Sequence, residues 1–200
     1  MTEIFVLLIF LYSVIIHEVS HGWAALKLGD DTAEKMGRLT LNPLPHLDLF
    51  GSILLPLILA LTRSPILFGW AKPVPYNPLK LKHPARDSAL LALAGPTSNL
   101  ILAFIFGIFI RFSHYFTAFQ SLNPFFLIIV QVNLVLAIFN LVPLPPLDGS
   151  KILFYFWPNA KLEIFLEKYS FLILLLFLMF GWGLISPVIS GLQFLFTGIP

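Results

Sequence analysis

At residues 4–28 the chain reads IFVLLIFLYSVIIHEVSHGWAALKL, an apolar run with the motif His17-Glu18-Val19-Ser20-His21 inside it. A helix needs about 20 residues to cross a bilayer, so this run is long enough to span one. Burying ionisable side chains in the middle of a membrane helix costs free energy unless a metal ion, water or an opposite charge stabilises them. The stretch therefore predicts a membrane helix that carries a functional site.

The spacing of the motif favours a metal site. Residues i and i+4 project from the same face of a helix, so His17 and His21 can direct both imidazoles at one Zn²⁺ ion. Glu18 lies beside them as a candidate general base. The same motif occurs by chance in unrelated chains, and it is its position inside an apolar run that favours metal binding here.

The composition indicates a polytopic membrane protein. Of the 200 residues, 58% are hydrophobic and 11% are charged, whereas soluble domains usually carry about 25% charged residues. Cysteine is absent, so disulfides and thiolate ligands are excluded and metal ligands must come from His, Asp, Glu or Asn. The net charge is only +2, and the basic residues lie in loops beside apolar segments. We therefore expect contact with lipid headgroups and no binding of nucleic acid.

The apolar pattern predicts an all-α polytopic fold with four main transmembrane helices and a re-entrant or short fifth segment. The four helices are expected at residues 4–28, 88–110, 124–142 and 170–185. The fifth segment, Leu49 to Trp70, contains Pro56 and Arg63-Ser64-Pro65, and it can form either a distorted span or a re-entrant hairpin.

Shorter segments complete this predicted fold. The tail that follows Pro187, residues 188–196, is too short to span and is expected to form a half-helix or an interfacial segment. Residues 37–43 and 72–76 are bounded by proline, which disfavours helix in the preceding residue. They are predicted to be short extended segments or edge strands near the membrane surface.

A second polar cluster follows the third predicted span, from Asn140 to Gly149, and reads NLVPLPPLDG. Three prolines in four positions stop the helix near Val142. The backbone N–H and C=O groups that lose their helical hydrogen bonds there need other partners within the membrane, which only protein or a water-filled cavity can supply. Asp148 can be the third ligand of a His-His-Asp zinc site. It can equally be the N-cap of a following helix, and spacing alone does not separate the two roles.

Together these motifs resemble the site-2 protease family of intramembrane zinc metalloproteases, in its compact form without an added PDZ or CBS domain. The resemblance extends over nearly the whole chain and implies a single membrane-embedded metalloprotease domain over residues 1–200. Its motifs are His17 to His21, Gly37 to Pro43 with His46 and Asp48, Phe68 to Pro75, Ala94 to Asn99, and Asn140 to Gly149.

The resemblance implies a function and a role for each matching residue. It implies one Zn²⁺ per chain with His17, His21 and Asp148 as ligands, Glu18 as the base, and Asn140 as a polar group near the scissile carbonyl. The implied activity is hydrolysis of peptide bonds within transmembrane segments of membrane-protein substrates. The alternative is a non-proteolytic metal-binding scaffold or transport protein. The presence of Glu18 argues against it, because a scaffold needs no base.

Further residues are candidates for the surroundings of the site. His46 lies in a family motif close behind the first helix, and Asn99 is expected to hydrogen-bond a residue of the site. Val74 lies in a segment that can hold an unwound substrate strand by edge addition. Gly95 is expected to let helices pack closely.

The basic residues predict the orientation of the chain. If Leu49 to Trp70 is re-entrant, nearly all of them share one side of the membrane and only Arg111 faces the other, with Arg63 inside the hairpin. The shared side contains Lys27, Lys35, Arg38, Lys72, Lys80, Lys82, Arg86, Lys151, Lys161 and Lys168. By the positive-inside rule this side is cytoplasmic. We expect an enzyme of the plasma membrane with its active site toward the cytoplasm.

Overall fold

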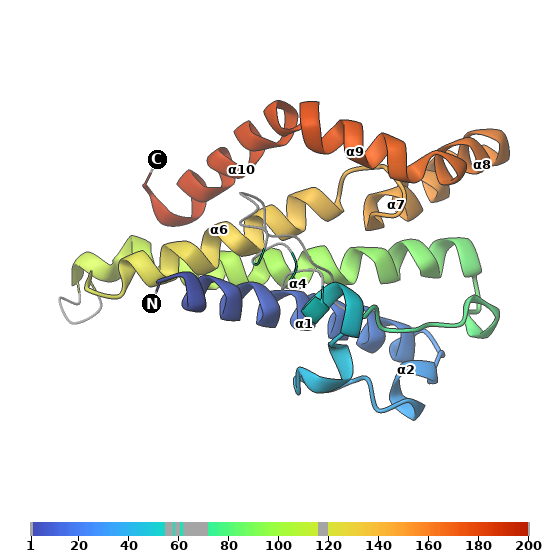
Figure 1. The fold of residues 1–200 in the computed structure, drawn as a ribbon, viewed down its shortest axis with the longest axis horizontal. Coiled ribbons are helices and arrows are strands. Elements are labelled where there is room, and N and C mark those ends of the chain that lie inside the picture. The colour runs from blue at the N-terminus through green and yellow to red at the C-terminus, as the bar shows by residue number, and fades with distance from the viewer. Residues whose placement is uncertain (1, 55–57, 59–60, 62–71, 116–119, 200) are drawn as a thin grey trace.

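The computed structural model describes all residues except 1, 55–57, 59–60, 62–71, 116–119 and 200 (Figure 1). Within the described residues the fold is entirely helical, which confirms the all-α class. Three of these helices are long and apolar enough to cross a membrane, and a bent pair of helices can form a fourth span. The chain is therefore an integral membrane protein.

The centre of the fold is a bundle of three long helices, α1 (Thr2–Lys27), α4 (Pro84–Phe112) and α6 (Asn123–Asn140). They pack against one another, with α4 antiparallel to the other two (Figure 1). Both α4 and α6 have a proline in the first turn, where its missing N–H removes no helical hydrogen bond. The spans predicted at residues 4–28, 88–110 and 124–142 correspond to these three helices.

The fourth predicted span is bent. Helix α9 (Ser170–Phe180) ends at Gly181, and α10 (Trp182–Thr197) leaves it at an angle of 63°. The expected boundary at Pro187 is wrong, because α10 continues through that residue as one helix. A proline in the second turn removes only one backbone hydrogen bond, and the helix tolerates that loss.

A small apolar core lies where α10 packs on α4 and α6. It consists of Ala103, Ile110, Val130, Leu134, Ile185 and Ile189, all nearly inaccessible. Many other large apolar side chains on the described helices point outward and are exposed. In a bilayer such side chains face lipid, so a small core is compatible with a folded membrane protein.

The predicted helix break after α6 is confirmed. Helix α6 ends at Asn140, and the chain resumes helical structure at α7 (Asp148–Phe156), followed by α8 (Ala160–Lys168). The peptide bond between Pro145 and Pro146 is cis. Helix α7 packs against α4, so the break returns the chain to the central bundle.

The connection between α1 and α4 contains only short helical elements among its described residues. These are α2 (Thr32–Lys35), η1 (Leu44–His46), η2 (Leu49–Leu54) and η3 (Pro78–Lys80), and a further short element, η4 (Ser113–Tyr115), follows α4. The predicted hairpin at Leu49 to Trp70 lies largely outside the described residues. Of it, only residues 49–54, 58 and 61 are described.

The segments predicted to be extended, 37–43 and 72–76, form no strand in the described part of the chain. A side chain holds them together instead. The guanidinium of Arg38 donates hydrogen bonds to the carbonyl oxygens of Lys72 at 2.8 Å and Pro73 at 3.2 Å. Pro73 has no N–H to donate to a neighbouring strand, and the N–H of Val74 donates to Glu18, so two successive backbone positions are not available for strand pairing.

Asp30 ties the second of these segments to the end of α1. Its side chain is fully buried and accepts hydrogen bonds from the backbone N–H groups of Asn77 at 2.5 Å and Thr32 at 3.0 Å. Burial alone raises the pKa of this carboxyl, but these bonds, together with one from the Thr32 hydroxyl, lower it on balance. The carboxylate thus fixes residues 72–77 beside α1.

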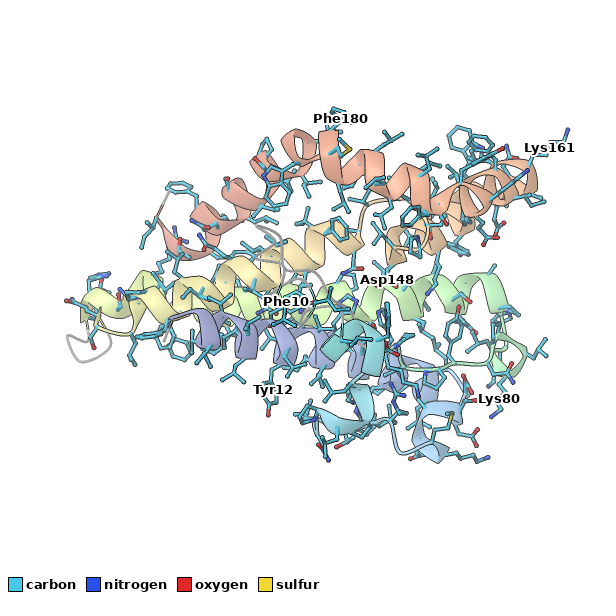
Figure 2. All side chains as sticks on the ribbon, in the orientation of Figure 1. Phe10, Tyr12, Lys80, Asp148, Lys161 and Phe180 are labelled. Atoms are coloured by element: carbon cyan, nitrogen blue, oxygen red, sulfur yellow. The ribbon has the colours of Figure 1, made fainter. Side chains whose placement is uncertain are left out.

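Most of the lysine and arginine side chains lie toward one end of the bundle. Helix α2, the start of α4, and helices α7 and α8 lie at that end, whereas both termini lie toward the other (Figure 1). Lys80 and Lys161 mark the basic end in Figure 2. Arg111 lies near the opposite end, where its guanidinium donates to the carbonyl oxygen of Leu195 at 2.7 Å.

Candidate metal centre

The two histidines of α1 meet Asp148 inside the protein. His17 and His21 lie one turn apart, and the Nε2 atom of each is 3.1 Å from Oδ2 of Asp148. All three side chains are buried, and their ligand atoms lie within 4.8 Å of one another. Figure 2 shows Asp148 close to the long helices. The structure thus brings together residues that are 131 positions apart in the chain.

The local structure of α7 distinguishes the two roles considered for Asp148. The N-cap of α7 is Leu147, and no side chain caps the helix. Asp148 is the first helical residue, and its carboxylate faces the histidines. The next residue, Gly149, packs so closely on the end of α6 that an added Cβ would lie 2.2 Å from the carbonyl oxygen of Leu141. The geometry of Asp148 is therefore that of a ligand.

Hydrogen bonds on the far side of each imidazole orient the Nε2 atoms. His21 Nδ1 lies 2.7 Å from the carbonyl oxygen of Leu91, which can only accept, so Nδ1 is the donor. His17 Nδ1 donates in the same way to Oδ1 of Asn99 at 2.6 Å. Each neutral ring therefore keeps an unprotonated Nε2 directed at Asp148, as a metal ligand requires.

This donor set fits a zinc ion. Two ligands held about 2.0 to 2.1 Å from a tetrahedral ion lie about 3.3 Å apart, close to the 3.1 Å that separates each Nε2 from Oδ2. Lone pairs that converge without a proton repel one another, and a cation between them removes the repulsion. Nitrogen and oxygen ligands in this number suit Zn²⁺.

Gly95 of α4 makes room for both imidazoles. A Cβ at this position would lie 2.5 Å from Nε2 of His17 and 2.5 Å from Nε2 of His21. The sequence predicted close packing at Gly95, and the structure shows that the groups packed there are the histidines themselves.

Glu18 lies at the same cavity and is held by the backbone. The N–H of Val74 donates to Oε2 of Glu18 at 2.8 Å. Both residues line a cavity with a volume of about 190 Å³, into which the three ligands also open. Asn140 lines it too, while its side-chain amide donates to the carbonyl oxygen of Leu136 at 2.9 Å.

Lys151 is a cavity residue that the sequence motifs did not single out. Its ammonium group lies 3.7 Å from Oδ1 of Asp148, the carboxylate oxygen that does not face the histidines. The same group lies 5.3 Å from the centre of the Tyr76 ring. Lys151 follows Asp148 by one turn, and this spacing on a helix is the signal that could have indicated it.

His46 lies elsewhere in the connection between α1 and α4. It is fully buried, and its Nε2 lies 2.8 Å from the carbonyl oxygen of Thr40. Its own carbonyl oxygen accepts from the N–H of Lys72 at 2.8 Å. His46 therefore links Thr40 to Lys72 within this connection, and among the described residues it does not belong to the group that could hold the metal ion.

Asp148→Ala is expected to lower zinc occupancy, because it removes one of three protein ligands and leaves the two histidines without their anionic partner. Zinc per chain can be measured by mass spectrometry of the purified protein after exchange into zinc-free buffer. Ser150→Ala, two residues further along the same helix, is the matched control and should keep its zinc. Full occupancy in Asp148→Ala would remove this residue from the ligand set.

Comparison with known proteins identifies the family. Residues 115–181 match the model of Peptidase family M50. The protein named "Putative zinc metalloprotease YwhC" from Bacillus subtilis (strain 168) is 45% identical over 172 residues, which cover 82% of this chain and 74% of that protein.

A second relative is more distant. The protein named "Putative zinc metalloprotease Rip2" from Mycolicibacterium smegmatis is 32% identical over 149 residues, 73% of this chain and 55% of that protein. No solved structure gave a significant match. The chain belongs to peptidase family M50, the site-2 protease family, and is a membrane zinc metallopeptidase.

Proposed function

We propose that the chain is an intramembrane zinc endopeptidase that hydrolyses peptide bonds within transmembrane segments of other membrane proteins. The observation that carries the proposal is the position of the Glu18 carboxylate. It opens into the same cavity as His17, His21 and Asp148, and this cavity lies in a bundle of helices long enough to cross a membrane. We infer that the described elements act as one membrane-embedded domain over residues 1–200.

Glu18 is proposed to move the protons of the reaction. Bound zinc would supply a Lewis acid that polarises the scissile carbonyl and makes water more acidic. Glu18 takes a proton from the attacking water and delivers it to the leaving amine. The hydrogen bond from the N–H of Val74 keeps one carboxylate oxygen in place. We propose that this contact orients the base, and the substrate contact predicted for the segment of Val74 stays a prediction beside it.

Residues that line the cavity are proposed to receive the substrate. A helical substrate hides its carbonyl groups in internal hydrogen bonds, so it must unwind before a peptide bond can reach Glu18. Asn140 lines the cavity at the end of α6 and is proposed to contact an exposed carbonyl of the substrate. Pro73 and Tyr76 line the same cavity from the segment beside α1 and are proposed to contact the unwound strand.

Peptide cleavage that depends on zinc tests this proposal directly. Purified protein in liposomes should cut a transmembrane substrate, lose activity after chelation, and regain it when zinc is added. Fragments identified by mass spectrometry should end within the apolar segment. Zinc binding without any cleavage across a panel of membrane-protein substrates would favour the alternative of a metal-binding scaffold or transporter.

The cavity is proposed to face the cytoplasmic side of the plasma membrane. Asp148 begins α7, which lies at the basic end of the bundle (Figure 1). Clustered Lys and Arg beside membrane helices favour retention on the cytoplasmic side. Lipid headgroups are the expected partners of these side chains.

Single cysteines test the orientation, because the natural chain has none. Cysteine at Thr40 or Lys80 is expected to react with a membrane-impermeant thiol reagent only after the cytoplasmic face is exposed, because both positions lie in the connection between α1 and α4, whose basic residues predict the cytoplasmic side. Ser113, after the opposite end of α4, is buried, so a cysteine at its exposed neighbour His114 should react from outside. Labelling of positions 40 and 80 from opposite sides would overturn this topology.

A further inference from the structure

A buried chain of polar side chains extends from His17 away from the cavity. Ser13 lies on α1, Asn99 on α4 and Asn133 on α6, with exposed fractions of 3%, 0% and 0%. An unpaired polar group at this depth in a membrane is costly, and each of these side chains is hydrogen-bonded. Neither Ser13 nor Asn133 belongs to the motifs from which the site was recognised.

Two main-chain carbonyl groups determine which way the amides point. Nδ2 of Asn99 lies 3.2 Å from the carbonyl oxygen of Ser13, and Nδ2 of Asn133 lies 2.9 Å from that of Ile129. A carbonyl oxygen only accepts, so the amide nitrogens must face these atoms. The second hydrogen of Asn99 Nδ2 then goes to Oδ1 of Asn133 at 2.8 Å. Asn133 Nδ2 donates its other hydrogen to Oγ of Ser13 at 3.0 Å.

These hydrogen bonds make Nδ1 of His17 a hydrogen-bond donor. Because both hydrogens of the Asn99 amide are used elsewhere, Oδ1 of Asn99 faces His17 and can only accept. The proton must lie on Nδ1, and Nε2 is left as a ligand. His21 reaches the same tautomer through the carbonyl group of Leu91, which belongs to the main chain. The orientation of His17 therefore depends on side chains, and that of His21 does not.

We propose that Asn133 and Ser13 are positioning residues for zinc binding. They hold the amide of Asn99 in one orientation, and Asn99 in turn fixes the tautomer and ring plane of His17. Groups behind a ligating histidine typically change metal affinity by about 10- to 100-fold when they are removed. This role concerns zinc affinity alone, so it holds or fails separately from the proposed proteolysis.

The test is a graded series of substitutions with zinc affinity as the readout. Asn133→Leu is close to isosteric and removes the partner of Asn99, so zinc should bind about 10- to 100-fold more weakly. Ser13→Ala removes only the last acceptor and should weaken binding by about two- to tenfold. The dissociation constant is measured by competition with a chelator, using the full chain in detergent.

A neighbouring residue separates positioning from loss of packing. Leu134 is also fully buried on α6 but lies outside the hydrogen-bonded chain. Leu134→Ala should lower the Tm through a cavity and leave zinc affinity unchanged. An equal loss of zinc affinity in Leu134→Ala and Asn133→Leu would overturn the proposal, because it would make the effect one of packing.

Nitrogen NMR of ¹⁵N-labelled histidine supplies a second readout on zinc-free protein, at a pH high enough for both imidazoles to be neutral. The wild type should show His17 as the Nδ1–H tautomer, and Asn133→Leu should show a mixture, with the signals of His21 unchanged. If Asn133→Leu does not fold, Ser13→Ala decides the question by both measurements. Wild-type zinc affinity and an unchanged His17 tautomer in the folded variant would refute the assignment.

Discussion

Glu18→Gln is expected to keep its zinc and lose proteolysis. Glutamine has nearly the same size as glutamate, and its oxygen can still accept the hydrogen bond from the N–H of Val74. It cannot take a proton from water, and a general base contributes typically about 10²- to 10⁴-fold to a rate. Zinc per chain and the initial rate of cleavage should be measured on the same preparation.

The matched control is Glu34→Gln, which makes the same chemical change on an exposed residue of α2. This variant should cleave at the wild-type rate. A wild-type rate in Glu18→Gln would remove Glu18 from the mechanism. Loss of zinc together with activity would instead give Glu18 a role in metal binding.

Gly95→Ala is expected to abolish tight zinc binding, although it adds only one methyl group. The new Cβ would lie 2.5 Å from the ligand nitrogens of both His17 and His21. Either α4 must move away from α1 or the imidazoles must turn from Asp148. Each change disrupts the ligand set, so zinc affinity should fall by at least about 100-fold, measured by competition with a chelator.

Gly191→Ala is the control for the same substitution in a membrane helix. An added Cβ there meets nothing within 4 Å, so zinc affinity and cleavage should be unchanged. Wild-type zinc affinity in Gly95→Ala would mean that the imidazoles do not lie against α4 as described.

The sequence predicted those parts of the fold and site that depend on local spacing. The apolar runs locate α1, α4 and α6 to within a few residues, because a membrane helix needs a fixed length of apolar chain. The separation of His17 and His21 places them on one face for the same local reason. The bend at Gly181 was missed because an apolar run has the same composition whether it is straight or bent.

Contacts between distant segments could not be predicted in the same way. Asp148 could have been a ligand or a cap until the packing of α7 against α4 showed which way its carboxylate faces. Gly95 was expected to contact another helix, because spacing does not tell which side chains lie opposite a glycine. Asn133 was not recognised, although a polar residue inside an apolar span is a signal in its own right.

The central claim is that one zinc ion joins the two halves of the chain. X-ray absorption at the zinc edge of the purified wild-type protein tests this claim most directly. The account predicts one zinc per chain, four-coordinate, with two imidazole nitrogens at about 2.0 to 2.1 Å and oxygen in the remaining positions. It also predicts that the spectrum changes in Asp148→Ala, which removes one of the oxygen ligands. A protein without bound zinc, or one with three or more imidazole ligands, would contradict the account.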